Sequence, residues 1–236
     1  MVYITGDTHR DFYRIKYFCE KCKTNKNDVL IILGDVGINY YLDISDRRLK
    51  NELDRLPITL FCVHGNHEER PYLVKDDSGN DTYEQKCIFG ATAYVEKKHP
   101  SIIFAKDGEY YHIDNHHYFV IGGAYSVDKQ YRLIKGYKWF ESEQADNEIK
   151  KRVEDNLMKL NNEVDIVLSH TCPLKYVPNE FFISNVDDSN IDRSMENWLD
   201  KIEDNINYNQ WYFGHYHNYK SIDKMTLLFN DIKEII

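Results

Sequence analysis

The sequence lacks the features of several common classes of protein. No apolar run approaches the ~20 residues that a membrane-spanning helix requires. The first residues, MVYITGDTHR, show neither the basic region nor the cleavage site of a signal peptide. There is no internal repeat, no low-complexity tract and no linker rich in proline, glycine and serine. These absences favour one domain over residues 1–236, without contact to a membrane.

Cysteine is scarce, with five residues, an odd number. Without an export signal, this predicts reduced thiols and a cytoplasmic protein. Cys19 and Cys22 are spaced as in many zinc sites, but no second pair follows them. Two ordinary thiols are therefore the favoured interpretation.

An excess of basic residues is also lacking, since 39 acidic residues outnumber 30 basic ones and the net charge is −9. A long nucleic-acid groove gains affinity mainly from Lys and Arg, so a nuclease is the less favoured function. Bound divalent cations reverse the field at a carboxylate-lined site, however, and an acidic protein can still attract a phosphate there. A hydrophobic content of 42% is typical of a globular chain.

The first third of the chain alternates between short apolar runs and amphipathic stretches, which predicts βαβ units and a parallel sheet. The expected strands are Val2–Thr5, Val29–Leu33 and Thr59–Val63, and the expected helices are Asp11–Lys23 and Ser45–Leu56. The polar segment over residues 68–100 is expected to be an insertion or a lid.

From Ile102 onward the pattern changes to short strands separated by turns, which predicts an antiparallel meander. Its strands are expected at Ile102–Phe104, Tyr110–Ile113 and Tyr118–Ile121. Two helices are then predicted at Glu141–Leu160 and Ile191–Ile202, and further strands at Ile166–Leu168, Trp211–Phe213 and Thr226–Phe229.

Five short polar motifs follow five of the predicted strands. They are Gly6-Asp7-Thr8-His9, Gly34-Asp35, Gly65-Asn66-His67-Glu68, Ser169-His170 and Gly214-His215-Tyr216-His217. Any one of them alone is weak evidence, because Gly-Asp pairs are usually turns and single histidines are common on surfaces. The carboxyl ends of strands in an α/β sheet converge on one crevice, however, so the five motifs are expected to meet.

The side chains of these motifs suit a site for two divalent ions. They offer carboxylate, imidazole and amide oxygen, with no thiolate. Two cations about 3.5–4 Å apart repel each other, and a shared carboxylate lowers that cost. Asp35 is the only acid in its motif and is the natural bridge. Asp7 and His9, separated by one residue, are expected to face the same ion.

The order GDxH, GD, GNHE, H and GHxH resembles the calcineurin-like metallophosphoesterase family. The resemblance implies a four-layer αββα sandwich, an α/β fold in which two mixed sheets are flanked by helices. It also implies that Asp7, His9 and His217 hold the first ion, that Asp35 bridges both, and that the second ion is held by Asn66, His170 and His215. The implied chemistry is a single-step attack on phosphorus by a metal-bridging hydroxide, with His67 stabilising or protonating the leaving oxygen.

Two departures from the family pattern matter. The first motif often ends in glycine, but this chain has Arg10. The second motif reads GDVGINY, so Ile38 stands where the protein Ser/Thr phosphatase branch has the carboxylate that orients its equivalent of His67. A protein-phosphatase assignment is therefore disfavoured.

The sequence predicts a hydrolase acting on a phosphomonoester or a phosphodiester, such as a nucleotide. Two divalent ions are expected, Mn²⁺ in an assay with Fe or Zn as alternatives in the cell, since the ligand set does not select one metal. A silent scaffold or sensor of the same fold is the rival from another class. Candidate substrate contacts are Arg10, Arg70, Lys129 and Arg132.

Overall fold

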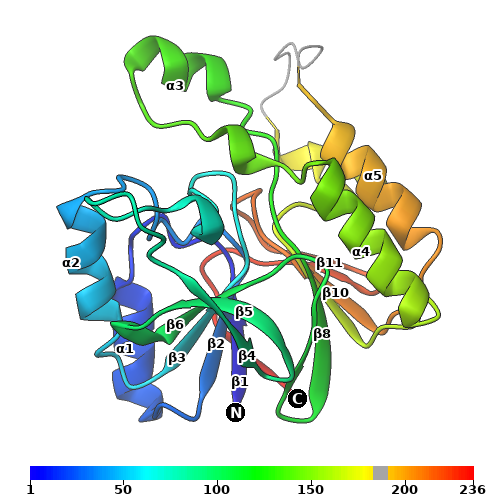
Figure 1. Cartoon of the computed structure of the whole chain (residues 1–236). Coiled ribbons are helices and arrows are strands. Elements are labelled where there is room, and N and C mark those ends of the chain that lie inside the picture. The colour runs from blue at the N-terminus through cyan, green and yellow to red at the C-terminus, as the bar shows by residue number, and fades with distance from the viewer. Residues whose placement is uncertain (183–190) are drawn as a thin grey trace.

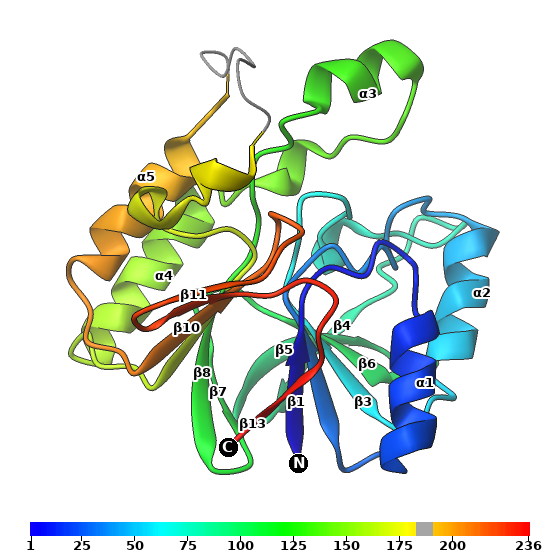
Figure 2. The same cartoon turned by 180° about the vertical axis from the view of Figure 1, so that it is seen from behind.

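The computed structural model describes residues 1–182 and 191–236. Two β-sheets face each other, and helices cover the outer face of each sheet (Figures 1 and 2). The seven-stranded sheet has the order β13-β1-β2-β3-β6-β5-β4, and the six-stranded sheet has the order β11-β12-β10-β9-β8-β7. The four-layer mixed α/β fold expected from the sequence is confirmed.

The strands of the two sheets lie close to the predicted runs. Those of the first sheet are β1 (Val2–Thr5), β2 (Val29–Ile32), β3 (Thr59–Cys62), β4 (Glu84–Ile88), β5 (Ala91–Glu96), β6 (His99–Ala105) and β13 (Lys233–Ile235). Those of the second are β7 (Tyr110–Ile113), β8 (His116–Ile121), β9 (Ile166–Ser169), β10 (Gln210–Phe213), β11 (Lys220–Ile222) and β12 (Met225–Leu227). β1, β2, β3 and β6 pair in parallel, as do β8, β9, β10 and β12.

Alternation along β2 explains how the first sheet is covered on both faces. Successive side chains of a strand point to opposite faces. Ile31 therefore packs in the cluster between the two sheets, whereas Leu30 and Ile32 pack outward. The outward cluster contains residues of α1 (Tyr13–Cys22) and α2 (Ile44–Leu53). Continuous apolar runs such as VLII are what a doubly covered strand requires.

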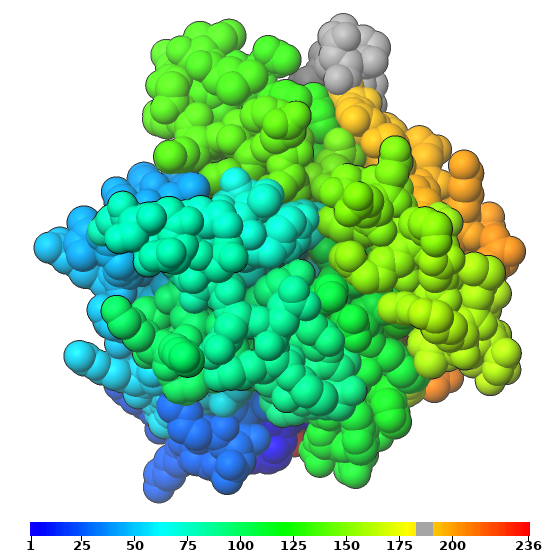
Figure 3. All heavy atoms as spheres, viewed as in Figure 1, coloured from blue at the N-terminus to red at the C-terminus, as the bar shows by residue number. Residues whose placement is uncertain are grey.

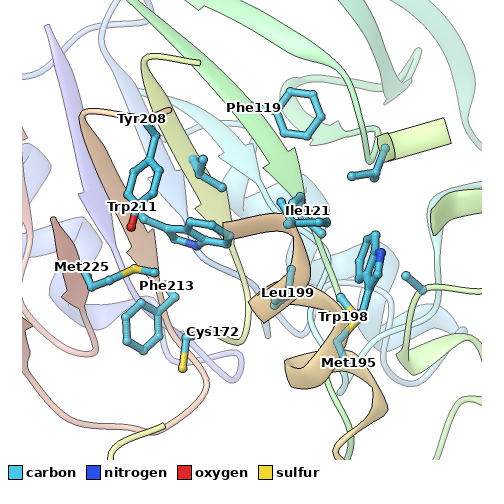
Figure 4. Packing of buried hydrophobic residues seen from close by; sticks show 14 of the residues in the cluster. Phe119, Ile121, Cys172, Met195, Trp198, Leu199, Tyr208, Trp211, Phe213 and Met225 are labelled. Atoms are coloured by element: carbon cyan, nitrogen blue, oxygen red, sulfur yellow. The ribbon is translucent and has the colours of Figure 1, made fainter. Parts of the chain in front are cut away.

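The second sheet is covered by α4 (Asn147–Lys159) and α5 (Ser194–Glu203). α4 buries Ile149, Val153 and Leu157, which recur every four residues along one face. Figure 4 shows the sheet residues Phe119, Ile121 and Trp211 beside Trp198, Met195 and Leu199 of α5. This packing holds the carboxyl ends of β9 and β10 in a fixed position.

Two expectations from the sequence are wrong. Ile102–Phe104 does not join a meander with the two following strands, because β6 pairs with β3 and β5 in the other sheet. The segment expected to be an insertion or a lid contains β4 and β5, which extend the first sheet, and its role as an insertion or a lid stays a prediction. The helix expected at Glu141–Leu160 begins only at Asn147, because the Asp146 side chain caps it by accepting from the Ile149 amide.

Several elements were not expected from the sequence, among them β4, β5, β11, β13 and a short helix. β13 returns the chain to β1, with which it pairs antiparallel. A short helix, α3 (Lys129–Lys135), has no buried residue and stands off the body of the molecule (Figures 1 and 3). Within the described residues, every helix is too short or too polar to cross a bilayer.

Candidate metal centre

The five polar motifs emerge at the carboxyl ends of β1, β2, β3, β9 and β10. The two sheets bring these ends together at one edge of the sandwich, where the loops meet (Figure 2). Backbone contacts join the motifs directly. The amide of His215 donates to Oδ1 of Asp7 over 2.9 Å, and the amide of His67 donates to Oδ1 of Asp35 over 2.8 Å.

Asp7, His9 and His217 form one group of ligand atoms. Nε2 of His217 lies 3.1 Å from Oδ2 of Asp7 and 2.8 Å from Nε2 of His9. Nε2 of His9 lies 3.6 Å from the same carboxylate oxygen. Asp7 is buried, whereas the side chains of His9 and His217 are 34% and 47% exposed. This group therefore lies on the solvent side of the site.

Asn66, His170 and His215 form a second, deeper group. Oδ1 of Asn66 lies 2.8 Å from Nε2 of His170 and 3.1 Å from Nδ1 of His215. Nδ1 of His170 donates to the carbonyl oxygen of Leu33 over 2.6 Å, which leaves Nε2 to face the site. The orientation of a ligating imidazole is commonly set by such a second contact.

Asp35 lies between the two groups. Its Oδ2 is 3.7 Å from Nε2 of His9, and its Oδ1 is 3.5 Å from Nε2 of His170. Asp7 also approaches both sides, because its ligand atom lies within 4.8 Å of those of Asp35 and His170. The bridging role of Asp35 stays a prediction that this placement supports.

Several site residues adopt left-handed backbone conformations, which are uncommon for residues other than glycine. The φ angles are 44° at His9, 49° at Asp35, 70° at His215 and 48° at His217. Conformations of this kind cost of order 1–3 kcal/mol each and cluster at functional sites. The loops therefore hold these side chains in place at a cost in stability.

Two motif glycines make room for ligands that belong to other motifs. A Cβ atom on Gly65 would lie 2.1 Å from both the amide nitrogen and Oδ1 of Asp35. A Cβ atom on Gly34, where φ is 96°, would lie 2.2 Å from Nδ1 of His170. The glycines thus permit the close approach of neighbouring loops.

The electrostatics of the site favour charged carboxylates and a neutral deep histidine. Burial alone would raise the pKa values of Asp7 and Asp35. At Asp7 the hydrogen bond of His217 and the nearby His9 ring outweigh burial, and at Asp35 the attraction of His170 and His67 does so, so both pKa values are lowered. Burial, with a contribution from His170, lowers the pKa of His215 to about 3. Both states are those that metal ligation requires.

These donors fit the two ions that the sequence predicts. The described residues contain two groups of at least three carboxylate and imidazole ligands, Asp7-His9-His217 and Asp7-Asp35-His170. Imidazole with carboxylate suits several first-row divalent ions, so the donor set does not identify the metal.

His67 lies beside these groups, with Nε2 3.9 Å from Oδ2 of Asp35. Arg132, from α3, places Nη2 3.2 Å from the same ring nitrogen. A guanidinium only donates, so Nε2 of His67 is the acceptor. Burial lowers the pKa of His67 and Arg132 adds to this effect, while Asp35 opposes it. Ile38, which replaces the orienting carboxylate of the protein-phosphatase branch, is buried in the apolar cluster on the outer face of the first sheet.

The other three predicted substrate contacts lie in different surroundings. Arg10 donates to the carbonyl of Gly37 and to Asp46, and its φ of 71° lies where the family often has glycine. Arg70 is buried and pairs with Asp107 over 2.5 Å. The ammonium of Lys129 lies 3.8 Å from the centre of the Trp139 ring. Among the described residues, Arg132 is the one of the four that has a hydrogen bond to a side chain of the site.

Two polar residues beside the site were not singled out from the sequence. Oγ of Ser126 accepts from Nδ2 of Asn66 over 2.9 Å, and the Ser126 amide donates to Glu143. Ser126 lies shortly after Gly122 and Gly123, and glycines of this kind are the one signal in the sequence for a loop that approaches the site closely. Glu143 carried no comparable signal in the sequence.

The model of one family, described as the calcineurin-like phosphoesterases, matches residues 1–219. The chain belongs to this family. Membership supports a metal-dependent phosphoesterase, and members generally bind two divalent ions. A comparison with curated proteins finds no match.

Two solved structures have a similar fold. The protein TT1561 of Thermus thermophilus is 13% identical, with a TM-score of 0.51, and the match covers 97% of this chain and 87% of that one. A second crystal structure is 12% identical, with a TM-score of 0.50, and the match covers 96% of this chain and 88% of that one. At such low identity the similarity shows the fold alone.

Proposed function

We propose that this chain hydrolyses a phosphoester with two divalent ions held at the meeting point of the five loops. Asp7, His9 and His217 would hold the first ion and Asn66, His170 and His215 the second, with Asp35 between them. One observation carries the proposal. Seven potential ligands from five separate loops converge on one edge of the sandwich, with neighbouring ligand atoms 2.8–3.7 Å apart.

Divalent ions bound there would lower the pKa of a water molecule towards neutrality and offset the charge of phosphoryl oxygens. The protein's own contribution is to place the ligands. The strained loops and the close approach at Gly65 fix Asp35 before any ion binds. Such preorganisation avoids reorganisation during the reaction.

Arg132 and His67 would act on the substrate. The guanidinium reaches the site from α3 and is supported by Asp128 and Tyr40, so it can bind a phosphoryl oxygen. If the Arg132 guanidinium donates to a phosphoryl group, Nε2 of His67 no longer has Arg132 as its donor. The imidazole could then carry a proton on Nε2 and give it to the departing oxygen.

Phosphomonoesters and phosphodiesters share the chemical group that this site would bind. Either a phosphomonoester or a phosphodiester, including a nucleotide, presents the oxygens that the ions and Arg132 would contact. The net charge of −9 disfavours long nucleic acid. A cytoplasmic location would agree with the five cysteines, all of which are free thiols.

The test is hydrolysis of mono-aryl and bis-aryl phosphates by protein reconstituted with Mn²⁺, compared with Asp35→Asn. We expect turnover by the wild type and a loss of about 10³-fold or more in Asp35→Asn, because the shared carboxylate is weakened. The matched control is Asp155→Asn, which removes an exposed partner of Lys151 and is expected to leave turnover unchanged. Two bound ions without hydrolysis of any phosphoester in a broad panel would instead favour the silent scaffold.

A further inference from the structure

Asn66 is useful as a metal ligand in only one of its two amide orientations. Its carboxamide has an oxygen that accepts and an NH₂ group that donates. In the structure Oδ1 faces Nε2 of His170 and Nδ1 of His215, the other members of the deeper group. Rotation by half a turn would place two N–H donors there instead, and these would repel a cation. A hydrogen-bond partner is therefore needed to keep the Asn66 amide in the orientation that presents Oδ1 to a metal ion.

The NH₂ group of Asn66 has one main acceptor, the hydroxyl of Ser126. Nδ2 of Asn66 lies 2.9 Å from Oγ of Ser126, and both residues are buried. The other neighbour of Nδ2 is Nε2 of His67 at 3.3 Å. The lone pair of that nitrogen already faces Arg132. Ser126 is therefore the partner on which the orientation of Asn66 depends.

Glu143 holds Ser126 at the position from which its hydroxyl accepts. Glu143 is 2% exposed, and both the Ser126 amide and Nε1 of Trp139 donate to its carboxylate. The contact from the Ser126 amide measures 3.3 Å. The backbone of Ser126 is thereby fixed beside Asn66, with Oγ 2.9 Å from Nδ2.

We infer that Glu143 and Ser126 are positioning residues that fix the amide oxygen of Asn66 towards the second metal ion. The inference rests on the proposed function. The carboxylate of Glu143 holds the backbone amide of Ser126, and the hydroxyl of Ser126 accepts from the NH₂ group of Asn66.

The backbone around these residues is tied down. The amide of Ala124 donates to the carbonyl of Glu143 over 3.1 Å. This hydrogen bond joins the two ends of the segment that carries α3. The amide of Gly123 donates to the carbonyl of His64, two residues before Asn66. The three side chains thus sit where the loop after β8 joins the loop after β3. A fixed base of this kind is what a positioning function needs.

The test is calorimetric titration of metal-free protein with Mn²⁺, comparing the wild type with Ser126→Ala. We expect the wild type to bind two ions. In Ser126→Ala the affinity for the second ion should fall by about 10- to 100-fold, the usual effect of losing a partner of a metal ligand, while the first ion binds as before. The matched control is Ser142→Ala, whose hydroxyl donates to Glu69 and not towards Asn66, and which should bind both ions like the wild type.

The same substitution in an Asn66→Asp variant distinguishes an effect on the orientation of residue 66 from a general loss of folding stability. In Asn66→Asp either carboxylate oxygen can face the ion, so adding Ser126→Ala should change the affinity for the second ion less than it does with Asn66. Equal losses in the two backgrounds would overturn the inference, as would wild-type affinities in Ser126→Ala or a matched weakening of both ions. A wild type that binds no pair of ions would instead refute the proposed function itself.

Discussion

Arg132 donates to Nε2 of His67 over 3.2 Å, although 65 residues separate them in the sequence. The contact joins α3, which buries none of its residues, to the loop that carries Asn66. Asp128 accepts from Nε of the same guanidinium over 2.8 Å and holds it in place. Within the described residues, no other of the four predicted substrate contacts reaches a side chain of the proposed centre.

Arg132→Ala is expected to lower kcat/KM for phosphoester hydrolysis by about 10- to 100-fold, because a charge-assisted contact to the phosphoryl group is lost. Arg132→Lys should recover only part of the loss, since an ammonium cannot reproduce the planar fork. Lys135→Ala on the same helix serves as the control. Steady-state kinetics check this, and an unchanged kcat/KM in Arg132→Ala would remove Arg132 from the proposal.

His67→Ala is expected to slow substrates with poor leaving groups more than aryl phosphates. An aryl oxygen departs without a proton, whereas an alkyl oxygen needs one, and a positioned acid contributes about 10²–10⁴-fold. The comparison is the ratio of rates for an alkyl and an aryl phosphate in wild type and variant. The same loss on both substrates would show that His67 does not protonate the leaving group.

Gly65→Ala is expected to weaken metal binding because its Cβ would collide with the amide and Oδ1 of Asp35. Overpacking of this kind costs about 1–3 kcal/mol of folding stability as well. Gly90→Ala is the control, since a Cβ there meets nothing within 4 Å but a φ of 82° still strains the backbone. Chemical unfolding measures the loss of folding stability, and metal titration measures the loss of metal affinity. Normal metal binding by Gly65→Ala would contradict the tight fit described at Asp35.

Glu196 in α5 offers a test of stability that is independent of the metal centre. Burial raises the pKa of this carboxyl, with Arg193 opposing the shift, and Oε2 has no hydrogen-bond partner in the part of the chain that the structure describes. A raised folded pKa means that protonation favours the folded state. Its contribution is fully present below the unfolded value near 4.5 and is lost as pH rises through the folded value.

Glu196→Gln should therefore gain stability relative to the wild type as pH rises from about 4 to 7, by on the order of 1 kcal/mol per unit of pKa shift. Urea unfolding at several pH values measures the difference. A difference between the two proteins that stays constant with pH would contradict a raised pKa at Glu196.

Local pattern was enough to predict the parts of the fold that are set by local physics. Runs such as VLII at Val29–Ile32 need burial on both faces, and the structure places them in the centre of a sheet. The motif order placed Asp7, Asp35, Asn66 and His215 at strand ends, where the structure brings them together. These patterns depend only on residues that are close in the sequence, so they can be recognised without knowledge of the tertiary structure.

Other features depend on pairing between distant segments, which leaves no local trace. Ile102–Phe104 reads equally well as a meander strand or as a partner of β3, and only tertiary packing decides. The segment Lys233–Ile235 is too short to predict, but β1 offers it an edge. Arg10 and Arg70 pair with Asp46 and Asp107, which are 36 and 37 residues away, so the sequence alone does not reveal these partners.

Crystals of the protein soaked in Mn²⁺ and measured at the manganese absorption edge would test the central claim most directly. We expect two anomalous peaks about 3.5–4 Å apart. One should lie among Asp7, His9 and His217, the other among Asn66, His170 and His215, with Asp35 touching both. A single peak, or two peaks that do not share Asp35, would contradict a dinuclear centre bridged by this carboxylate.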